Sequence, residues 1–172
     1  MIIIGITGPT GAGKTTALGE VEKLGGAVID CDAVYHDLLE SDKTLQNRLE
    51  QEFGDIRDDS GAVDRTRLLL EECRAKGMPL AAVDAIGLLE SGLGDLCHAT
   101  VAVVAPPEVR VARIMAREGI SQDYAWSRVR AQKPDSYFTG GCGYTLNNDC
   151  ATGAEFAARA RALLESILQK GA

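Results

Sequence analysis

One run of residues near the start constrains this chain more than any other. Residues 2–6, Ile-Ile-Ile-Gly-Ile, form an apolar run of the kind that becomes a buried parallel strand. The chain continues into Gly8-Pro-Thr-Gly-Ala-Gly-Lys-Thr15, which matches the G-x-x-x-x-G-K-[ST] pattern of a phosphate-binding P-loop. A helical pattern then extends from about Lys14 to Leu24. Strand, glycine loop and helix N-terminus therefore come in the order that the motif needs.

Backbone chemistry explains why this pattern binds phosphate. Gly8, Gly11 and Gly13 carry no Cβ, so the loop can curl with its N–H groups turned inward. Those donors and the positive end of the helix dipole form a cradle for an anion. Lys14 adds a charge that reaches the β- and γ-phosphates, and the Thr15 hydroxyl is placed to bind Mg²⁺. The alternative, an ordinary glycine turn, would match the pattern by chance in about one chain in a hundred of this length, so we predict nucleotide-phosphate binding.

Composition narrows the class of protein. The 172 residues suffice for one domain with a full core. A net charge of −7 and a pI of about 4.9 argue against broad nucleic-acid binding. No apolar run approaches the ~18 residues of a transmembrane helix, and the apolar start lacks the basic region of a signal peptide. The five cysteines form no CxxC motif, so we expect reduced thiols, no zinc site and a cytoplasmic protein.

Acidic residues follow two of the predicted strands. Residues 27–30 form a short strand pattern that ends at Asp30, and Asp32 comes two residues later. Residues 79–84 form another strand pattern that ends at Asp84, which is similar to a Walker B position that orients Mg²⁺. Ligands of open parallel sheets bind at the carboxyl ends of the strands. Asp32 is therefore a candidate general base or a ligand of the metal's water shell, and the alternative is a helix N-cap; for Asp84 the alternative is a loop cap.

The remaining pattern alternates helices with strands. Further strands are predicted over 98–105 and 144–149, and helices over 44–53, 64–76, 108–117, 121–130 and 152–169. Glu90 falls in a loop or short helix over 87–94, and residues 134–143 look irregular. Five strands alternating with helices predict an α/β fold: a five-stranded parallel sheet flanked by helices, of the P-loop nucleotide-kinase type.

An arginine-rich helix pair follows the fourth predicted strand. Arg110, Arg113 and Arg117 fall on one helical stripe, and Arg128 lies on the next predicted helix. Such a stripe is usually a solvated face. In an acidic protein with a P-loop it also fits a lid that covers phosphate, because the planar guanidinium makes bidentate contacts to phosphate.

Size and motifs favour a small-molecule kinase over other nucleotide-binding proteins. A chain of 172 residues leaves no room for the second domain of a motor, a transporter ATPase or a helicase. The guanine-reading Asn-Lys-x-Asp of a GTPase is missing from the sequence. We therefore expect phosphoryl transfer from ATP, with Mg²⁺, to a small acceptor.

Several separated stretches resemble the dephospho-coenzyme A kinase family. They are residues 5–16, including the P-loop; Val-Ile-Asp-Cys-Asp-Ala-Val-Tyr-His at 28–36; Leu-Leu-Glu-Ser-Gly at 88–92; the helix pair over 113–132, which ends in Ala-Gln; and Asn147-Asn148. The P-loop alone is common to many families, whereas the Asp-x-Asp and the Ala-Gln ending are more specific.

The resemblance implies transfer of the ATP γ-phosphate to the 3′-hydroxyl of dephospho-coenzyme A, the last step of coenzyme A synthesis. It implies that Asp32 acts as the base or orients the hydroxyl, with Asp30 beside it and Lys14 also catalytic. The implied ATP-binding residues are Gly11, Ala12, Gly13, Lys14, Thr15, Thr16, Arg113, Arg117 and Asn147, with Thr15 also at the metal. The implied substrate or lid residues are Asp84, Glu90 and Arg128. We expect a monomer or small homo-oligomer.

The middle of the chain departs from the family. Relatives usually carry a longer middle with a His-Pro pair, and here Leu70 runs to Met78 without one. We therefore expect one domain over 1–172, with a shortened substrate-side helical insertion over about 44–78 and a lid over about 113–140. Two alternatives remain at this point: a P-loop kinase for another small alcohol or nucleotide, and a nucleotide-binding regulator without catalysis.

Overall fold

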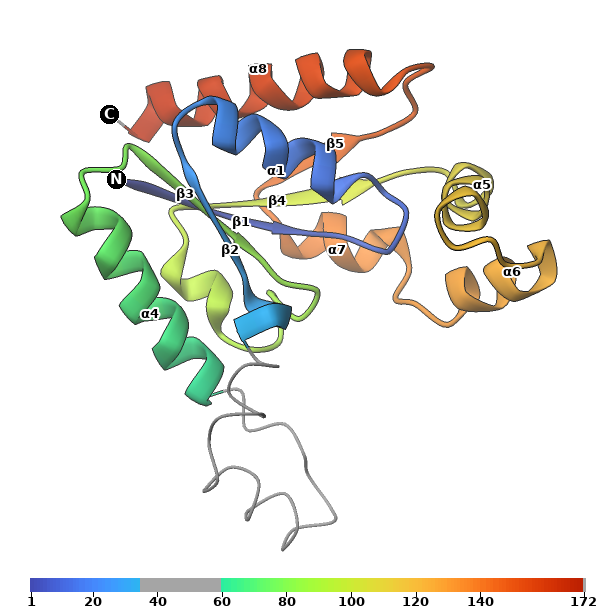
Figure 1. Cartoon of the computed structure of the whole chain (residues 1–172), viewed down its shortest axis with the longest axis horizontal. Coiled ribbons are helices and arrows are strands. Elements are labelled where there is room, and N and C mark those ends of the chain that lie inside the picture. The colour runs from blue at the N-terminus through green and yellow to red at the C-terminus, as the bar shows by residue number, and fades with distance from the viewer. Residues whose placement is uncertain (35–59, 172) are drawn as a thin grey trace, which may run out of the picture.

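The computed structural model describes residues 1–34 and 60–171, which form a five-stranded parallel sheet with helices on both faces (Figure 1). The strands are β1 (Ile2–Thr7), β2 (Ala27–Asp30), β3 (Leu80–Asp84), β4 (Ala99–Val104) and β5 (Tyr144–Asn147). They pair in the order β2-β3-β1-β4-β5, and every pairing is parallel. The predicted α/β fold with five parallel strands is confirmed. The strand that leads into the P-loop is the central one.

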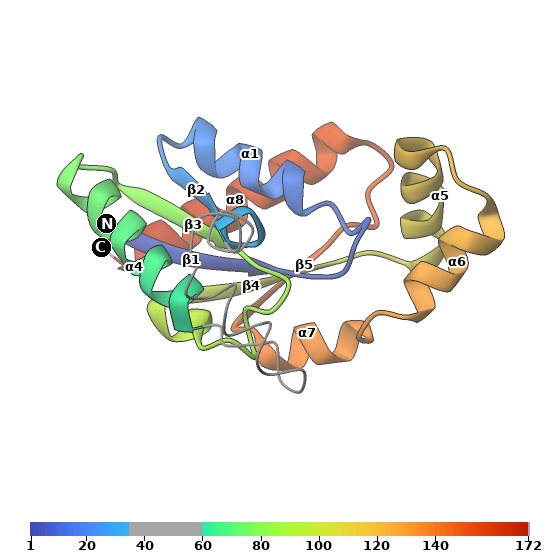
Figure 2. The ribbon, with the colours of Figure 1, turned by 60° about the horizontal axis from the view of Figure 1, so that its bottom comes forward.

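Alternation along β1 explains the two helical layers. Ile4 and Ile6 face α1 (Lys14–Lys23) and α8 (Gly153–Gly171). They pack in one buried cluster with apolar side chains from both helices. Ile3 faces the other side and packs in the cluster that contains Leu70 of α4 (Ser60–Ala75). Because successive strand residues point to opposite faces, the unbroken apolar run of β1 is what a central strand needs. Figure 2 shows the same layers from a second direction.

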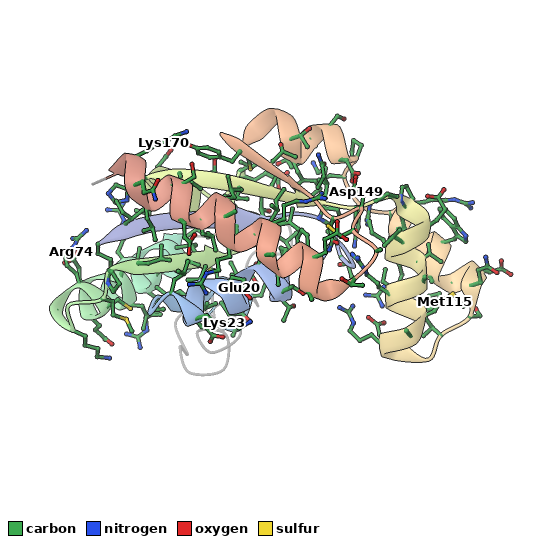
Figure 3. All side chains as sticks on the ribbon, turned by 90° about the horizontal axis from the view of Figure 1, so that it is seen from above. Glu20, Lys23, Arg74, Met115, Asp149 and Lys170 are labelled. Atoms are coloured by element: carbon green, nitrogen blue, oxygen red, sulfur yellow. The ribbon has the colours of Figure 1, made fainter. Side chains whose placement is uncertain are left out.

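The longest helix of the described residues, α8, lies along α1 across the same face of the sheet (Figure 3). It buries Phe156, Ala160, Leu164 and Ile167 at the spacing of one helical face. Glu20 of α1 is buried, and its carboxylate lies 3.9 Å from Arg161 of α8. None of the helices in the described ranges is both long and apolar enough to cross a membrane.

Two helices stand beyond the carboxyl edge of the sheet with a small core of their own. These are α5 (Pro107–Glu118) and α6 (Gln122–Arg130), which pack through Val111, Ile114, Ala125 and Val129. Figure 3 shows α5, with Met115 labelled, standing apart from the main layers. Ser121 caps α6 by accepting a hydrogen bond from the Tyr124 amide. The side chains of Arg110 and Arg113 connect α5 to the glycine loop after β1.

The structure corrects the sequence prediction in two elements, α7 and the start of α4. Residues predicted as irregular contain a helix, α7 (Asp135–Gly141), which is anchored by Phe138 against Ala102 and Val104 of β4. The helix predicted from residue 64 begins at Ser60, and the loop after β3 includes a 3₁₀ turn at Leu93–Leu96. The helix predicted over 44–53 lies outside the described residues.

Close approach of two backbones explains Gly8. Its φ of 145° lies in the left-handed half of conformational space, where side chains are rarely tolerated. A Cβ built on Gly8 would lie 2.0 Å from the backbone oxygen of Val103 in β4. The loop can therefore leave β1 along this path only with glycine at its first position.

We expect Gly8→Ala to lower the free energy of unfolding by on the order of 3 kcal/mol, because backbone strain adds to overpacking. The control is Gly19→Ala in α1, where a new Cβ has no atom within 4 Å. That change should raise stability by up to about 1 kcal/mol, because alanine favours a helix. Urea unfolding of both variants measures the contrast. Equal stabilities would contradict the close approach.

Candidate active site

The sheet register brings the predicted acidic residues to the phosphate loop. Ile6 of β1 pairs with Asp84 of β3, and Asp84 pairs in turn with Asp30 of β2. The glycine loop begins two residues after Ile6. The loop and the ends of β2 and β3 therefore share the carboxyl edge, where open parallel sheets bind ligands.

The loop ends at the N-terminus of α1, where Lys14 turns back over it. Gly13 precedes the helix with a φ of 110°, and a Cβ there would lie 2.2 Å from the Asn148 side chain. Lys14 Nζ donates to the Gly8 carbonyl at 3.4 Å and lies 3.6 Å from Asp84 Oδ1. Thr15 is exposed beside it. The start of α1 thus offers free N–H groups, an ammonium and a hydroxyl to an anion.

A cavity of about 370 Å³ opens over this helix start. It is lined by Pro9, Thr10, Gly11, Gly13, Lys14, Thr15, Asp84, Arg113, Arg117 and Arg128. Four of these side chains are cationic and only one is anionic. In a protein with a net charge of −7, such a local excess of cations marks an anion site.

Asp84 is the one carboxylate in the cavity wall. Its side chain is half-buried, and its Oδ1 atom is buried and accepts no hydrogen bond within the described part of the chain. At 3.6 Å its contact with Lys14 is an ion pair too long for a hydrogen bond. Burial raises the pKa of Asp84, the Lys14 charge opposes that rise, and repulsion from Asp30 and Asp32 adds to it. Burial is the largest of these effects. An oxygen of this kind is suited to accept hydrogen bonds from metal-bound water.

Asp30 and Asp32 are both exposed at the end of β2. The Asp30 carboxylate accepts a hydrogen bond from the Ala33 amide at 3.0 Å, so Asp30 caps the helical turn that begins at Cys31. The capping role considered as the alternative for Asp32 therefore belongs to Asp30. Asp32 lies near enough to Asp84 for its charge to affect that pKa.

Arg113 holds the back of the loop. Its Nη1 donates to the carbonyls of Gly11 and Ala12 at 3.1 and 3.2 Å, and its Nη2 donates to Asn148 Oδ1 at 3.0 Å. Asn148 is buried and donates through Nδ2 to the Ala12 carbonyl at 2.7 Å. These two side chains form what we call the Arg113–Asn148 clamp. It satisfies the carbonyls of the loop's second half.

Of the asparagine pair after β5, the side chain that contacts the loop is that of Asn148, which the sequence prediction had not singled out. Asn147 is exposed, and its carbonyl accepts a hydrogen bond from Arg159 at 2.9 Å. The Asn148 amide continues the sheet pattern by donating to Val104 O at 2.7 Å. Strand alternation was the available signal: a residue that follows buried Leu146 by two positions faces the same side.

Arg117 and Arg128, the other two arginines of the predicted lid, meet at one carboxylate. Glu118, the last residue of α5, pairs with Arg117 at 2.6 Å and with Arg128 of α6. The hydrogen bond from Arg117 is the main cause of the lowered pKa of Glu118, with further contributions from Arg128. Both arginines line the cavity. The α5–α6 pair therefore presents two guanidinium groups at the place where phosphate would lie.

Arg110 does not face the cavity, although the helical stripe grouped it with Arg113 and Arg117. It is 3% exposed, and burial lowers its pKa. Its guanidinium contacts Thr10 in the loop, Gln132 after α6 and Asp135 at the start of α7. Sequence alone had no signal for this burial, because the partners come from three separate segments.

A second cavity, of about 260 Å³, borders the first. Its walls include Ile86 and Glu90 from the loop after β3, Lys133 after α6, and Tyr137 and Phe138 of α7. Lys133 Nζ lies 3.1 Å from Glu90 Oε1 and 4.9 Å from the Tyr137 ring centre. Both cavities are also lined by Pro9 and Thr10, so these residues form the wall between them.

The site has no preformed metal cage. Within residues 1–34 and 60–171, no group of three or more His, Cys, Asp or Glu side chains is arranged to hold a metal ion. Magnesium in phosphoryl-transfer sites usually takes one or two protein ligands together with substrate phosphates and water. Thr15 and Asp84, which line the same cavity, fit that smaller requirement.

Replacing the buried charge should stabilise the fold. Because the folded-state pKa of Asp84 lies above its ordinary value of 3.8, the folded protein binds this proton more tightly than the unfolded chain. The stability of the wild type then falls as pH rises through the interval above 3.8. The Asp84→Asn variant does not lose this stability, because asparagine does not ionise. We expect the variant's Tm to exceed that of the wild type by a margin that grows with pH and then levels off.

The control is Asp149→Asn, because Arg159 lowers the pKa of Asp149. That variant should become less stable than the wild type as pH rises through the interval below 3.8. Thermal unfolding from pH 3 to 8 compares the two. A Tm difference for Asp84→Asn that does not change with pH would contradict the burial effect.

Comparison with known proteins agrees with this geometry. A family model described as dephospho-CoA kinase matches residues 2–75 and 69–153. A dephospho-CoA kinase of Thermus thermophilus is 35% identical over 155 residues, covering 78% of this chain and 76% of the relative. Another, from Dehalococcoides mccartyi, is 28% identical over 179 residues, covering 87% and 90%. The two matched stretches of the family model meet within α4, close to where the sequence departs from the family pattern.

Solved structures extend the similarity over the whole chain. A crystal structure of a Thermus thermophilus protein has a TM-score of 0.71 at 31% identity and covers 96% of this chain and 97% of its own. A dephospho-CoA kinase from Campylobacter jejuni gives 0.66 at 15% identity, covering 99% and 98%. A shikimate kinase from Bacteroides thetaiotaomicron gives 0.59 at 22%, covering 95% and 98%. The last two show the shared kinase fold, and with the sequence matches we conclude that the chain belongs to the dephospho-CoA kinase family.

Proposed function

We propose that this protein transfers the γ-phosphoryl group of ATP to the 3′-hydroxyl of dephospho-coenzyme A, the last step of coenzyme A synthesis. The observation that carries the proposal is one cavity in which the glycine loop, the Lys14–Asp84 ion pair and the lid arginines converge. The choice of dephospho-coenzyme A as the acceptor rests on membership of the family. The choice of ATP as the phosphoryl donor rests on the residues that line the cavity.

The residues from Gly11 to Thr16 bind the ATP phosphates through the backbone N–H groups of the loop and of the α1 N-terminus. Lys14 moves its ammonium from the Gly8 carbonyl onto the β- and γ-oxygens. Arg117 and Arg128 exchange part of their contact with Glu118 for phosphate oxygens, which carry more charge and accept bidentate hydrogen bonds. These contacts stabilise the charge that spreads over the transferring group. We assign exposed Asn147 to the adenine end of the site, as the resemblance to the family implies.

Thr15 and Asp84 fit a magnesium ion that accompanies ATP. The hydroxyl would bind the ion directly, and Asp84 Oδ1, buried and without a hydrogen bond, would accept from its water. The ion would neutralise charge on the β- and γ-phosphates during transfer. Within the chain, Asp84 also keeps Lys14 oriented at the cavity floor.

Asp32 orients the acceptor hydroxyl. Its exposed carboxylate at the end of β2 accepts the hydroxyl proton as the oxygen bonds to the γ-phosphorus and the bond to the ADP oxygen breaks. Asp30 holds the turn that carries Asp32, since it caps that turn. The second cavity takes part of the acceptor, with Glu90 and Lys133 as polar contacts on an apolar floor. Donor and acceptor then meet over Pro9 and Thr10.

An ADP-release assay with dephospho-coenzyme A, nucleosides, sugars, shikimate and gluconate tests the acceptor. We expect turnover with dephospho-coenzyme A alone, and a product one phosphoryl group heavier that carries phosphate at the 3′-position by NMR. Turnover with another acceptor alone would make the chain a different P-loop kinase. ATP binding without turnover on any acceptor would indicate a regulator.

Asp32→Asn should lower kcat by about 100-fold or more, because the general base is lost, and ADP affinity should stay within twofold of the wild type. Lys14→Met should weaken ATP binding as well as kcat. The matched control is Asp123→Asn, an exposed acid in the first turn of α6 away from both cavities, which should keep the wild-type kcat. Steady-state kinetics and calorimetry give the two readouts. A wild-type kcat in Asp32→Asn would remove Asp32 from the mechanism.

A further inference from the structure

The first half of the phosphate loop is held by the side chains of Arg110 and Gln132, and Gln132 also lines the second cavity. The Thr10 amide donates to Gln132 Oε1 at 3.0 Å, and the Thr10 carbonyl accepts from Arg110 Nε at 3.0 Å. Arg110 Nη2 also donates to Gln132 Oε1, at 2.5 Å. The three bonds close a ring around one backbone unit. We call Arg110 and Gln132 the Arg110–Gln132 clamp.

Burial makes this clamp stiff. Arg110 is 3% exposed, and Asp135, 3.4 Å away, is the carboxylate paired with it. A buried guanidinium stays charged, so losing one of its hydrogen-bond partners is strongly unfavourable. The tip of the loop, the segment after α6 and the start of α7 are therefore tied together.

The two clamps divide the loop between them. The Arg113–Asn148 clamp holds the carbonyls of Gly11 and Ala12, beside the nucleotide cradle. The Arg110–Gln132 clamp holds Thr10, which lines both cavities. The first clamp therefore supports the donor site, and the second supports the boundary between donor and acceptor.

We propose that Gln132 and Arg110 are positioning residues that fix the wall between the donor and acceptor cavities. This inference rests on the proposed function. A displaced Thr10 would leave nucleotide binding intact but would misalign the acceptor oxygen and the γ-phosphoryl. Misplacement of about 1 Å can slow a reaction about 100-fold. Loss of the clamp should thus lower kcat and leave nucleotide affinity unchanged.

The test compares Gln132→Leu, Gln132→Glu, Asn148→Ala and Arg130→Met. Leucine removes the acceptor oxygen, so we expect kcat to fall about 10- to 100-fold, with the Kd for ADP within twofold of the wild type and faster hydrogen exchange at the Thr10 amide. Glutamate keeps an oxygen that accepts from Thr10 and Arg110, and should restore most of kcat and of the protection. Asn148→Ala should show the reverse pattern, with weakened ADP binding as its larger effect. Arg130, exposed on α6 and stacked on Trp126, is the control and should match the wild type.

The proposed function and the role of the Arg110–Gln132 clamp can fail independently, and the measurements distinguish the two failures. If the wild type does not phosphorylate dephospho-coenzyme A, and Gln132→Leu still speeds exchange at Thr10, the proposed function fails while the clamp stands. If the wild type is active and Gln132→Leu leaves kcat and exchange unchanged, the clamp is overturned. Equal losses of kcat and ADP affinity in Gln132→Leu, or no rescue by Gln132→Glu, would also overturn it.

Discussion

The structure depends on satisfying the outward side of the phosphate loop. A loop that turns its N–H groups toward an anion leaves its carbonyls on the opposite side, and a buried carbonyl without a donor is destabilising by about 1–3 kcal/mol. Here the carbonyls of Thr10, Gly11 and Ala12 all accept from side chains of later segments. The donors are Arg110, Arg113 and Asn148, which come from α5 and from the end of β5. The helix pair and the last strand are therefore needed to shape the first loop.

Like charges lie close together at the same edge of the sheet, and a bound ligand of opposite charge would reduce their repulsion. Asp30 and Asp32 repel the Asp84 carboxylate where β2 and β3 end, and the Lys14 ammonium, 3.6 Å from Asp84, opposes that repulsion. On the other side of the cavity, Arg117 and Arg128 share Glu118. A polyphosphate with its cation brings both signs of charge to this edge. Binding can therefore offset the charge repulsion that remains at this edge after folding.

Local patterns predicted the start of the chain well, because strand, loop and helix there are contiguous in sequence. The register that joins Asp30 to Asp84 followed from the rule that parallel strands end at a common edge. Elements decided by distant packing were harder to predict. Two glycines argue against a helix at α7, yet Phe138 supplies enough burial against β4 to hold it. Arg110 has the same spacing as its neighbours, and only the meeting of α5, α7 and the loop makes it an interior residue.

The chain ends lie together at the edge of the sheet away from the cavities (Figure 1). A Cβ on Gly171 would lie 2.6 Å from the Ile2 side chain, so the end of α8 touches the start of β1. A short linker can therefore join the ends on this side of the domain, and new termini can open at the turn around Gly119 between α5 and α6. Such a circular permutant would cut the β4–β5 crossover at the turn between α5 and α6, and it would keep the chain unbroken from β1 to β4. The fold thus places one covalent link between α5 and α6 where it can be cut without cutting the chain between β1 and β4.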